Sequence, residues 1–182
     1  VSSDIENVFV AYLDQEKSAE VYSFDCDIIR PSNFRGKPEP GKPGLLLSFF
    51  TFKRSRLQLL LQEYEFEKKI IVIAEPLRSD LKWRRHYLEI ANYDIIQKNT
   101  PNTIVVGTLE PCDTFALFNT VTYKSGDYRD YNIYLAPLGG KMQTVGCYYF
   151  WRRHPDASVI FSQPRSYFVE NYSLGYRDTF IL

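Results

Sequence analysis

The residues best suited to binding a ligand form a corner with the sequence Pro-Leu-Gly-Gly-Lys-Met, at positions 137–142, directly after an apolar run. Consecutive glycines let backbone N–H groups approach a phosphate, the start of a following helix contributes a partial positive charge, and a lysine contributes a full one. Its spacing is neither G-x-x-x-x-G-K-[ST] nor G-x-G-x-x-G, and a glycine pair also makes a simple strand-to-helix turn, so both interpretations remain open. In the first interpretation, the anion site consists of Gly139, Gly140, Lys141 and Met142.

A second cluster of polar residues, within Phe-Lys-Arg-Ser at positions 52–55, follows an earlier apolar run. Lys53 and Arg54 supply positive charge, and Ser55 can both cap a helix and donate a hydrogen bond to a ligand oxygen. In an open parallel sheet both clusters lie beyond the carboxyl ends of the strands, which is where such sheets bind ligands. The alternative is a solvated group of charges in a loop.

Carboxylates follow two other apolar runs, at Glu75 and Glu110, and Asp113 comes soon after the second. Carboxylates at strand ends can act as acid and base or orient a ribose, so these three residues are the candidates for catalysis, although capping and turn roles are the commoner explanation. The two histidines, His86 and His154, are far apart in the sequence, and no G-x-S-x-G, H-E-x-x-H or metal-spaced cluster occurs. We therefore predict no metal and no cofactor, and leave open whether the protein is an enzyme.

Short apolar runs alternate with amphipathic stretches from Gly44 onward, a pattern that predicts βα units and a parallel sheet. Runs dense in Ile, Val and Phe are typical of strands covered on both faces. The predicted fold class is α/β, with a Rossmann-like open, mostly parallel sheet, helices on both faces and an N-terminal β addition. The five predicted strands are Leu45–Thr51, Lys69–Ala74, Thr103–Gly107, Asn132–Ala136 and Ser158–Ser162.

Apolar residues at helical spacing predict four helices between these strands. The first runs from Ser55 to about Tyr64, the second is capped by Ser79, and the third is capped by Asp113. In the fourth, the missing side chain of Gly146 is expected to let the helix lie close on the sheet. The apolar stripes are expected to be core, and that of the second helix consists of Leu81, Tyr87, Leu88, Ala91 and Ile95.

The sequence divides into residues 1–43 and 44–182. The first part holds two predicted strands, Val8–Leu13 and Glu20–Cys26, as a hairpin or an edge addition. It ends in the segment Arg30–Gly44, whose Pro, Gly and Lys content predicts an exposed linker. The second part is the Rossmann-like domain with an aromatic tail at 164–182, for which we predict a turn at Ser173–Gly175 and a last strand at Thr179–Leu182.

Composition limits the possible partners. Lysine plus arginine and aspartate plus glutamate both number 22, so the formal net charge is zero, which argues against broad electrostatic capture of nucleic acid or membrane. The three cysteines form no C-x-x-C pair, which favours a reducing compartment. No apolar run approaches the roughly 20 residues that span a bilayer, and no signal-peptide pattern opens the chain. We therefore expect a cytoplasmic protein without a membrane partner. Its start at Val1 is compatible with a processed or partial chain.

The order of strand, Gly-Gly-Lys-Met corner, helix and new strand resembles the CARF family, the CRISPR-associated Rossmann-like sensor domains, whose late strand commonly ends in a Gly-Thr-Lys or Gly-Gly-Thr-Lys corner. The resemblance covers residues 44–164 in the order of elements and 137–143 in motif. It implies a homodimer that binds an oligoadenylate through the loops after the first and fourth strands, here Ser48–Ser55 and Gly139–Met142. This chain lacks the threonine before Lys141, and with it a hydroxyl that would help to hold a phosphate or ribose.

Three functional hypotheses are compatible with these residues. The first is a homodimeric module that binds a phosphate-bearing nucleotide, among them a signalling oligonucleotide, with a base stacked on Phe50 or Phe52. The second is an enzyme that acts on a nucleotide or sugar phosphate. The third is an interaction subunit of a larger assembly, which docks through the aromatic tail from Tyr167 to Phe180.

Overall fold

A computed structural model describes residues 11–14, 17–18, 26–75, 79–99, 103–107, 111–166, 173–174 and 178–181 of the chain. The chain forms two compact units, one of residues 27–163 and one that combines residues 1–26 with 164–182. The candidate site belongs to the first unit.

The first unit is built on a sheet of five parallel strands in the order β6-β5-β4-β7-β8. All five strands lie within or close to the predicted segments, so the predicted α/β class with an open parallel sheet is confirmed. The fifth predicted strand is shorter than expected, because the chain leaves the sheet after Ile160, whose N–H donates to Leu135. The strands are β4 (Gly44–Phe49), β5 (Lys68–Glu75), β6 (Thr103–Gly107), β7 (Asn132–Ala136) and β8 (Ser158–Val159).

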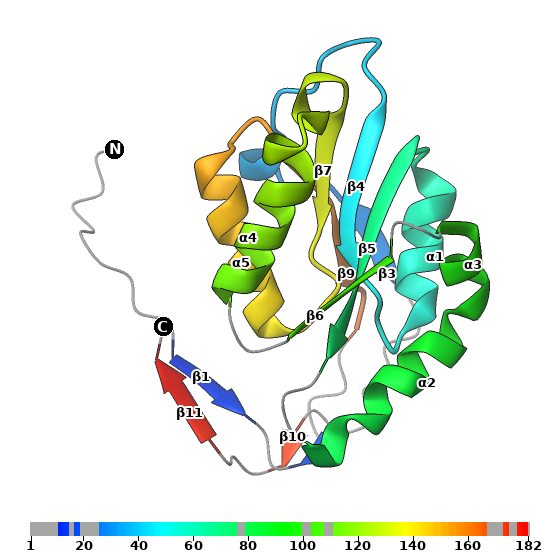
Figure 1. The fold of residues 1–182 in the computed structure, drawn as a ribbon, viewed down its shortest axis with the longest axis vertical. Helices are drawn as coiled ribbons and strands as arrows, with labels where there is room; N and C mark the ends of the chain where they lie inside the picture. Colours follow the sequence, from blue (N-terminus) through cyan, green and yellow to red (C-terminus); the bar gives the residue numbers. More distant parts are fainter. Residues whose placement is uncertain are drawn as a thin grey trace. The chain divides into compact units, whose positions relative to one another are not determined.

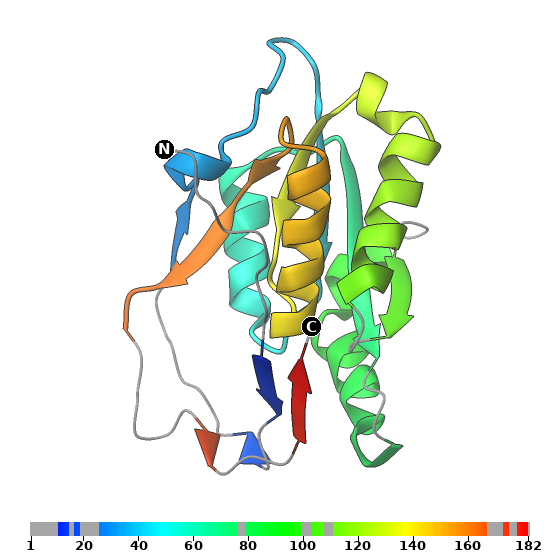
Figure 2. The same ribbon diagram turned by 90° about the vertical axis from the view of Figure 1, so that its left-hand side faces the viewer.

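Helices cover both faces of this sheet, as Figures 1 and 2 show. One face carries α1 (Arg54–Glu63) and α3 (Tyr93–Asn99), with α2 (Trp83–Ala91) leading into α3. The other carries α4 (Pro111–Asn119) and α5 (Lys141–Arg153). Short turns complete the connections, namely the 3-10 helices Ser32–Phe34, Ser79–Leu81 and Asp127–Arg129 and a π-helical turn, Thr120–Lys124.

The core consists of two hydrophobic clusters, one on each face of the sheet. Alternate residues of a strand point to opposite faces, and β4 shows this clearly. Leu45, Leu47 and Phe49 enter the cluster that contains Phe118 of α4 and Phe150 of α5. Leu46 and Phe50 enter the cluster of Leu57 and Leu60 from α1 and Ile95 from α3. Apolar residues on both faces of one strand are what the dense Ile, Val and Leu runs predict.

The strand order creates a switch point between β4 and β7. The chain runs from β4 through α1 to β5 on one side, and it returns through α4 to β7 on the other side of β4. The two strands are paired in parallel, with Ser48 opposite Ala136 near their carboxyl ends. Their outgoing helices, α1 and α5, cover opposite faces (Figure 1). In open α/β sheets this arrangement leaves a crevice beyond the strand ends, where ligands bind.

The three predicted helix N-caps are wrong, although the first helix lies within one residue of its predicted range. Helix α1 begins at Arg54 with Lys53 as its N-cap, so Ser55 lies inside the helix. Ser79 belongs to a separate 3-10 turn, and α2 begins only at Trp83. Helix α4 begins at Pro111, which places Asp113 in its first turn instead of at the cap. Proline fits the first position of a helix because it needs no N–H acceptor there.

The predicted second helix is interrupted at Asn92. Its side-chain Nδ2 donates to the carbonyl of Leu88, at 2.9 Å, and to the carbonyl of Thr51, at 3.3 Å. The residue ends α2 and is completely buried. Hydrogen bonding of an asparagine amide to nearby carbonyls competes with a continuous helix, and here it also joins the α2–α3 junction to the loop after β4.

Gly146 allows a close helix contact, although with a different neighbour from the one predicted. A Cβ at this position would lie 2.5 Å from the Pro111 carbonyl oxygen and 2.5 Å from Thr114 Cβ. Both atoms belong to α4, so the glycine permits α5 to approach α4 and not the sheet.

Residues 30–43, predicted as part of an exposed linker, belong to the first unit and form a belt that is hydrogen-bonded to the rest of it. Phe34 packs on Trp151 with ring centroids 4.6 Å apart, and the Lys37 N–H donates to the Asp156 carbonyl at 2.9 Å. Gly36 has φ of 61°, and a Cβ there would overlap the backbone of Asp156 and Ala157. The compact unit accordingly begins at Asp27, whereas the sequence suggested a division at residue 43.

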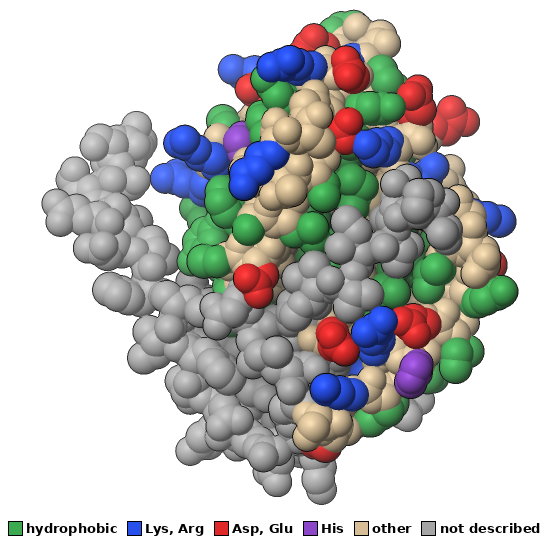
Figure 3. Space-filling model, in the orientation of Figure 1, with side chains coloured by type: hydrophobic (Ala, Val, Ile, Leu, Met, Phe, Trp, Pro, Cys, Tyr) green, Lys and Arg blue, Asp and Glu red, His purple; other side chains and the backbone are tan. Residues whose placement is uncertain are grey.

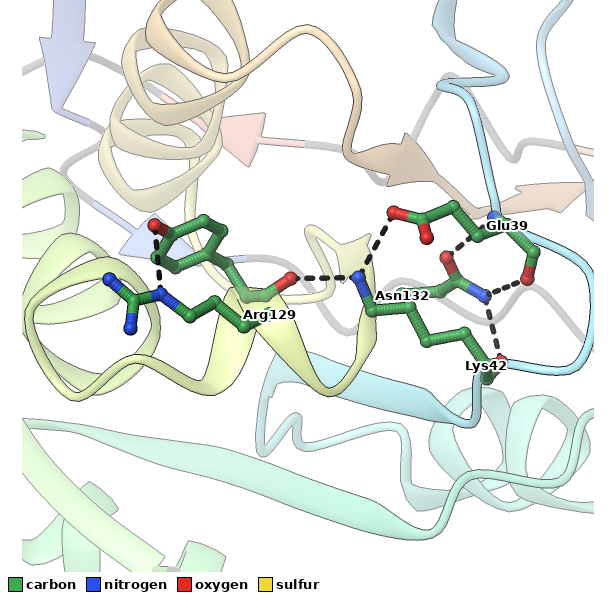
Figure 4. A network of polar contacts seen from close by, with 5 residues as sticks. Glu39, Lys42, Arg129 and Asn132 are labelled. Atoms are coloured by element: carbon green, nitrogen blue, oxygen red, sulfur yellow. Dashed lines mark hydrogen bonds and ion pairs between the residues drawn. The ribbon is translucent and has the colours of Figure 1, made fainter.

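Asn132, the first residue of β7, fastens the end of this belt (Figure 4). Its Oδ1 accepts from the Glu39 N–H at 2.8 Å, and its Nδ2 donates to the carbonyls of Glu39 and Lys42, at 2.9 and 2.8 Å. Its own N–H donates to the Pro43 carbonyl at 2.8 Å. A proline-rich segment can therefore be well ordered without regular secondary structure, because a side chain satisfies its backbone groups.

The remaining strands form small two-stranded sheets. β3 (Cys26–Ile29) pairs with β9 (Phe161–Pro164), β1 (Ala11–Asp14) is antiparallel to β11 (Asp178–Ile181), and β2 (Lys17–Ser18) is antiparallel to β10 (Ser173–Leu174). Within the described part of the chain, β1 and β2 thus pair with C-terminal segments. Ser173–Leu174 is a strand instead of part of a turn. Most of the predicted strand Glu20–Cys26 and the start of the aromatic tail, from Tyr167, lie outside the described residues.

Candidate ligand-binding site

The glycine corner after β7 is shaped by the end of β4. A Cβ on Gly139 would lie 2.9 Å from the Phe49 ring and 3.0 Å from Gln143 Oε1. Neither Gly139 nor Gly140 has a positive φ; Gly140 has φ of −71° and is the N-cap of α5. The first glycine is therefore required by close packing on β4, which brings the corner and the end of that strand into direct contact.

The buried side chain of Gln143 caps the first turn of α5. Its side chain is 3% exposed, and its Oε1 accepts from the Gly140 N–H. This is the glutamine half of a capping box, in which the residue at the third helical position bonds back to the N-cap amide. The amide of Gly140 is consequently occupied. The backbone amides that follow it, at positions 141–143, are those that point out of the end of a helix.

Two predicted members of the corner differ in exposure. The side chain of Lys141 is on the exposed part of the first turn, whereas Met142 is 4% exposed and packed in the protein. Met142 can thus contribute only its backbone to a ligand. The capping role of Gln143 was not predicted, although a glutamine three residues after the cap is a recognisable signal in the sequence.

The loop after β4 provides the other half of the site. Phe50 is 2% exposed and belongs to the core, while Phe52 is 46% exposed. Only Phe52 therefore remains as a surface on which a base can stack. The Thr51 hydroxyl accepts from the Lys53 N–H at 3.2 Å and shapes the turn into α1.

Arg54 has a structural partner within the site. Its guanidinium donates to Asp94 Oδ2 at 2.6 Å and to the Ala91 carbonyl at 3.4 Å. Asp94 is at the start of α3, so this ion pair connects α1 to the α2–α3 junction. The charge of Arg54 is balanced by Asp94. Of the other predicted cations, Lys53 is the N-cap of α1 and Lys141 is the first residue of α5.

Two of the three predicted carboxylates lie in the described part of the chain. Glu75 ends β5 and accepts from Arg85 at 3.4 Å, Asp113 is exposed in the first turn of α4, and Glu110 lies outside the described residues. The described residues give no contact between Glu75 and Asp113. The three catalytic candidates therefore remain predictions.

The two histidines have separate environments. His86 is 84% exposed on α2, with Nδ1 3.4 Å from Glu89 Oε2. His154 follows α5 and stacks on Tyr123, with ring centroids 3.6 Å apart. Burial and the nearby charge of Arg153 lower the pKa of His154. Burial also raises the pKa of the Tyr123 hydroxyl, with a further contribution from Asp156.

Helix α2 and the loop after β4 expose an aromatic surface beside the carboxyl edge of the sheet. Tyr87, which belongs to this surface, was predicted to lie in the core. We call this surface the aromatic ledge; it consists of Phe52, Trp83, Arg84 and Tyr87. Trp83 and Tyr87 are 57% and 53% exposed, and Leu88 is the one buried residue of α2. Residues 83 and 87 share a helix face because they are four positions apart, a spacing that does not reveal whether the face is covered.

The described residues contain no group of three or more His, Cys, Asp or Glu side chains that could hold a metal ion. In the same part of the chain, none of the helices has the length and apolar character needed to cross a bilayer. Comparison of the chain with protein-family models, with curated protein sequences and with solved structures finds no match.

Proposed function

We propose that residues 27–163 form a binding module for a phosphate-bearing nucleotide, with the ligand at the carboxyl edge of the sheet between β4 and β7. The observation that carries the proposal is the switch point, where two paired strands send their helices to opposite faces. Such points are the usual binding crevices of open α/β sheets.

The chemistry of the two loops supports an anionic ligand. The start of α5 combines outward backbone amides, a helix dipole and the exposed Lys141, all of which favour a phosphate. Lys53 precedes α1 on the neighbouring strand end. Contact between Gly139 and Phe49 holds the two loops against one another. Following the resemblance to CARF domains, the proposed role is that of a sensor, and the proposed assembly is a homodimer.

Isothermal titration with phosphate, ribose 5-phosphate, mononucleotides and short oligonucleotides tests this function. Charge-assisted hydrogen bonds contribute about 1.5–3 kcal/mol each, so we expect Lys53→Ala and Lys141→Ala each to weaken binding by about tenfold or more. The matched control is Lys37→Ala, in the belt, where the side chain is 86% exposed and 3.9 Å from Asp156. Absence of heat with every ligand, or equal affinity in the Lys53/Lys141 double variant, would contradict the proposal.

A further inference from the structure

A pocket lies at the amino end of the sheet, between the end of α1 and the start of β5. Gly44, the first residue of β4, is also part of its lining. Its volume is about 530 Å³, a size that is usual for small-molecule sites. The switch point lies at the carboxyl ends of the same strands, with Ser48 opposite Ala136. The pocket and the proposed phosphate site are therefore at opposite edges of the sheet.

The pocket has an aromatic wall whose rings are held in place by packing. The Tyr64 and Phe66 rings are stacked, with centroids 6.0 Å apart and planes 16° from parallel. Phe66 is 5% exposed and meets the Tyr134 ring edge-on, with centroids 5.5 Å apart. Leu61 of α1 adds an aliphatic side chain to the lining. This wall suits an apolar group of a ligand, because rings that are already positioned lose little conformational entropy on binding.

Charged side chains of both signs line the same pocket. Within the described part of the chain, the Glu65 carboxylate has no hydrogen-bond or ion-pair partner, so it does not pair with Lys69. The Lys69 ammonium donates to the Phe66 carbonyl at 2.8 Å, which uses one of its three N–H groups. Glu67 accepts from the Tyr131 hydroxyl at 3.1 Å. The pocket therefore retains one carboxylate and one ammonium that can each bond to a ligand.

The end of α1 makes one side of this pocket favourable to a positive group. A helix carries partial negative charge on its last carbonyls, and α1 has no basic residue in its last turn. The helix ends at Glu63, and Glu65 and Glu67 follow it. Figure 3 shows acidic side chains gathered at the upper right, where Figure 1 places the amino ends of β4 and β5. An ammonium group is therefore attracted to the carboxylates after α1, whereas Lys69 attracts a negative group to the start of β5.

We infer that this pocket binds a free amino acid with a large apolar side chain. The ammonium of the ligand bonds to Glu65, its carboxylate bonds to Lys69, and its side chain packs on Tyr64 and Leu61. A zwitterion satisfies both charges at once, whereas a simple cation would be repelled by Lys69 and a simple anion by the glutamates. The inference goes beyond the proposed function, since it concerns the other edge of the sheet and a ligand without phosphate.

Analogues of L-phenylalanine test this inference, because each lacks one of the two charges. Phenethylamine has no carboxylate, and 3-phenylpropionate has no ammonium. In two-dimensional NMR titrations of the full chain, we expect L-phenylalanine to shift the backbone amide signals of residues 65–69. Both analogues should bind about tenfold or more weakly, because each loses a charge-assisted hydrogen bond.

Two substitutions assign each charge of the ligand to its partner. Glu65→Gln should weaken the binding of L-phenylalanine by about tenfold or more and leave the affinity for 3-phenylpropionate unaltered. Lys69→Met should weaken the binding of L-phenylalanine to a similar degree and leave the affinity for phenethylamine unaltered. The matched controls are Glu63→Gln and Lys98→Met, at exposed positions outside the pocket lining. The dispersion of the amide spectrum verifies that each variant is folded.

The outcomes keep this inference separate from the phosphate site. Absence of amide shifts with L-phenylalanine at millimolar concentration would overturn the inference, and so would equal affinities for L-phenylalanine and phenethylamine. The Lys53/Lys141 double variant should bind L-phenylalanine as the parent does. Loss of binding in that variant would move the amino acid to the other edge of the sheet and overturn the inference. If phosphate compounds bind and L-phenylalanine does not, the inference fails and the proposed function stands.

Discussion

His154 is held between aromatic rings at the end of α5. It stacks on Tyr123, its ring lies 4.8 Å from that of Phe150, and its Nε2 is 3.0 Å from Asn119 Oδ1. The amide oxygen of Asn119 can only accept, so Nε2 is the donor in this contact. The surroundings favour the uncharged form, in agreement with the lowered pKa.

The lowered pKa predicts a loss of stability in mild acid. The unfolded chain takes up a proton on this residue near the ordinary value of 6.5, while the folded chain does so only at lower pH. The free energy of unfolding therefore decreases as pH falls below about 6.5, until the folded-state pKa is reached. Urea unfolding between pH 5 and 7.5 measures this dependence. We expect His154→Phe to flatten it. An unchanged slope in His154→Phe would exclude this role.

Among the elements, α4 and α5 pack closely against each other at Gly146. Alanine normally stabilises a helix interior by up to about 1 kcal/mol relative to glycine. At Gly146 the added methyl group meets the Pro111 carbonyl and Thr114 at 2.5 Å.

We therefore predict that Gly146→Ala destabilises the protein by about 1–3 kcal/mol, the usual cost of overpacking, in spite of the better helix propensity. Chemical denaturation monitored by circular dichroism measures the change. Thr144→Ala, at an exposed position of the same helix, serves as the comparison and should stay within about 0.5 kcal/mol of the parent. A stabilised Gly146→Ala protein would mean that the two helices are further apart than described.

The elements also show what the sequence could and could not predict. The strands were recognisable because burial on both faces demands continuous apolar runs such as Leu45–Phe49. The exposure of the outer face of α2 could not be predicted, because Trp83 and Tyr87 have the same spacing whether that face is covered or uncovered. The fixed conformation of the belt could not be predicted either, because it depends on hydrogen bonds from the side-chain amide of Asn132, ninety or more residues away. At the site, the sequence predicted both loops, whereas the burial of Met142 and Phe50 could be recognised only in the packed structure.

On the scale of the whole chain, residues 27–163 contain both hydrophobic clusters of the described core. A unit with its own core can fold independently. We predict that a fragment of residues 27–163 unfolds cooperatively on heating and keeps the affinity of the full chain for phosphate compounds. Calorimetry and titration of the fragment beside the full chain test this. A fragment without a cooperative transition would show that the remaining segments are needed for the sheet to form.

The belt has a consequence for the interpretation of sequence variants. Composition alone would class residues 39–42 as a tolerant surface loop, in which substitutions are harmless. Their backbone is bonded to Asn132 at the amino end of β7, and β7 pairs directly with β4. A change that disturbs these bonds therefore loosens the two strands that border the proposed site. Substitutions that alter the backbone conformation of this proline-rich segment are therefore expected to be destabilising.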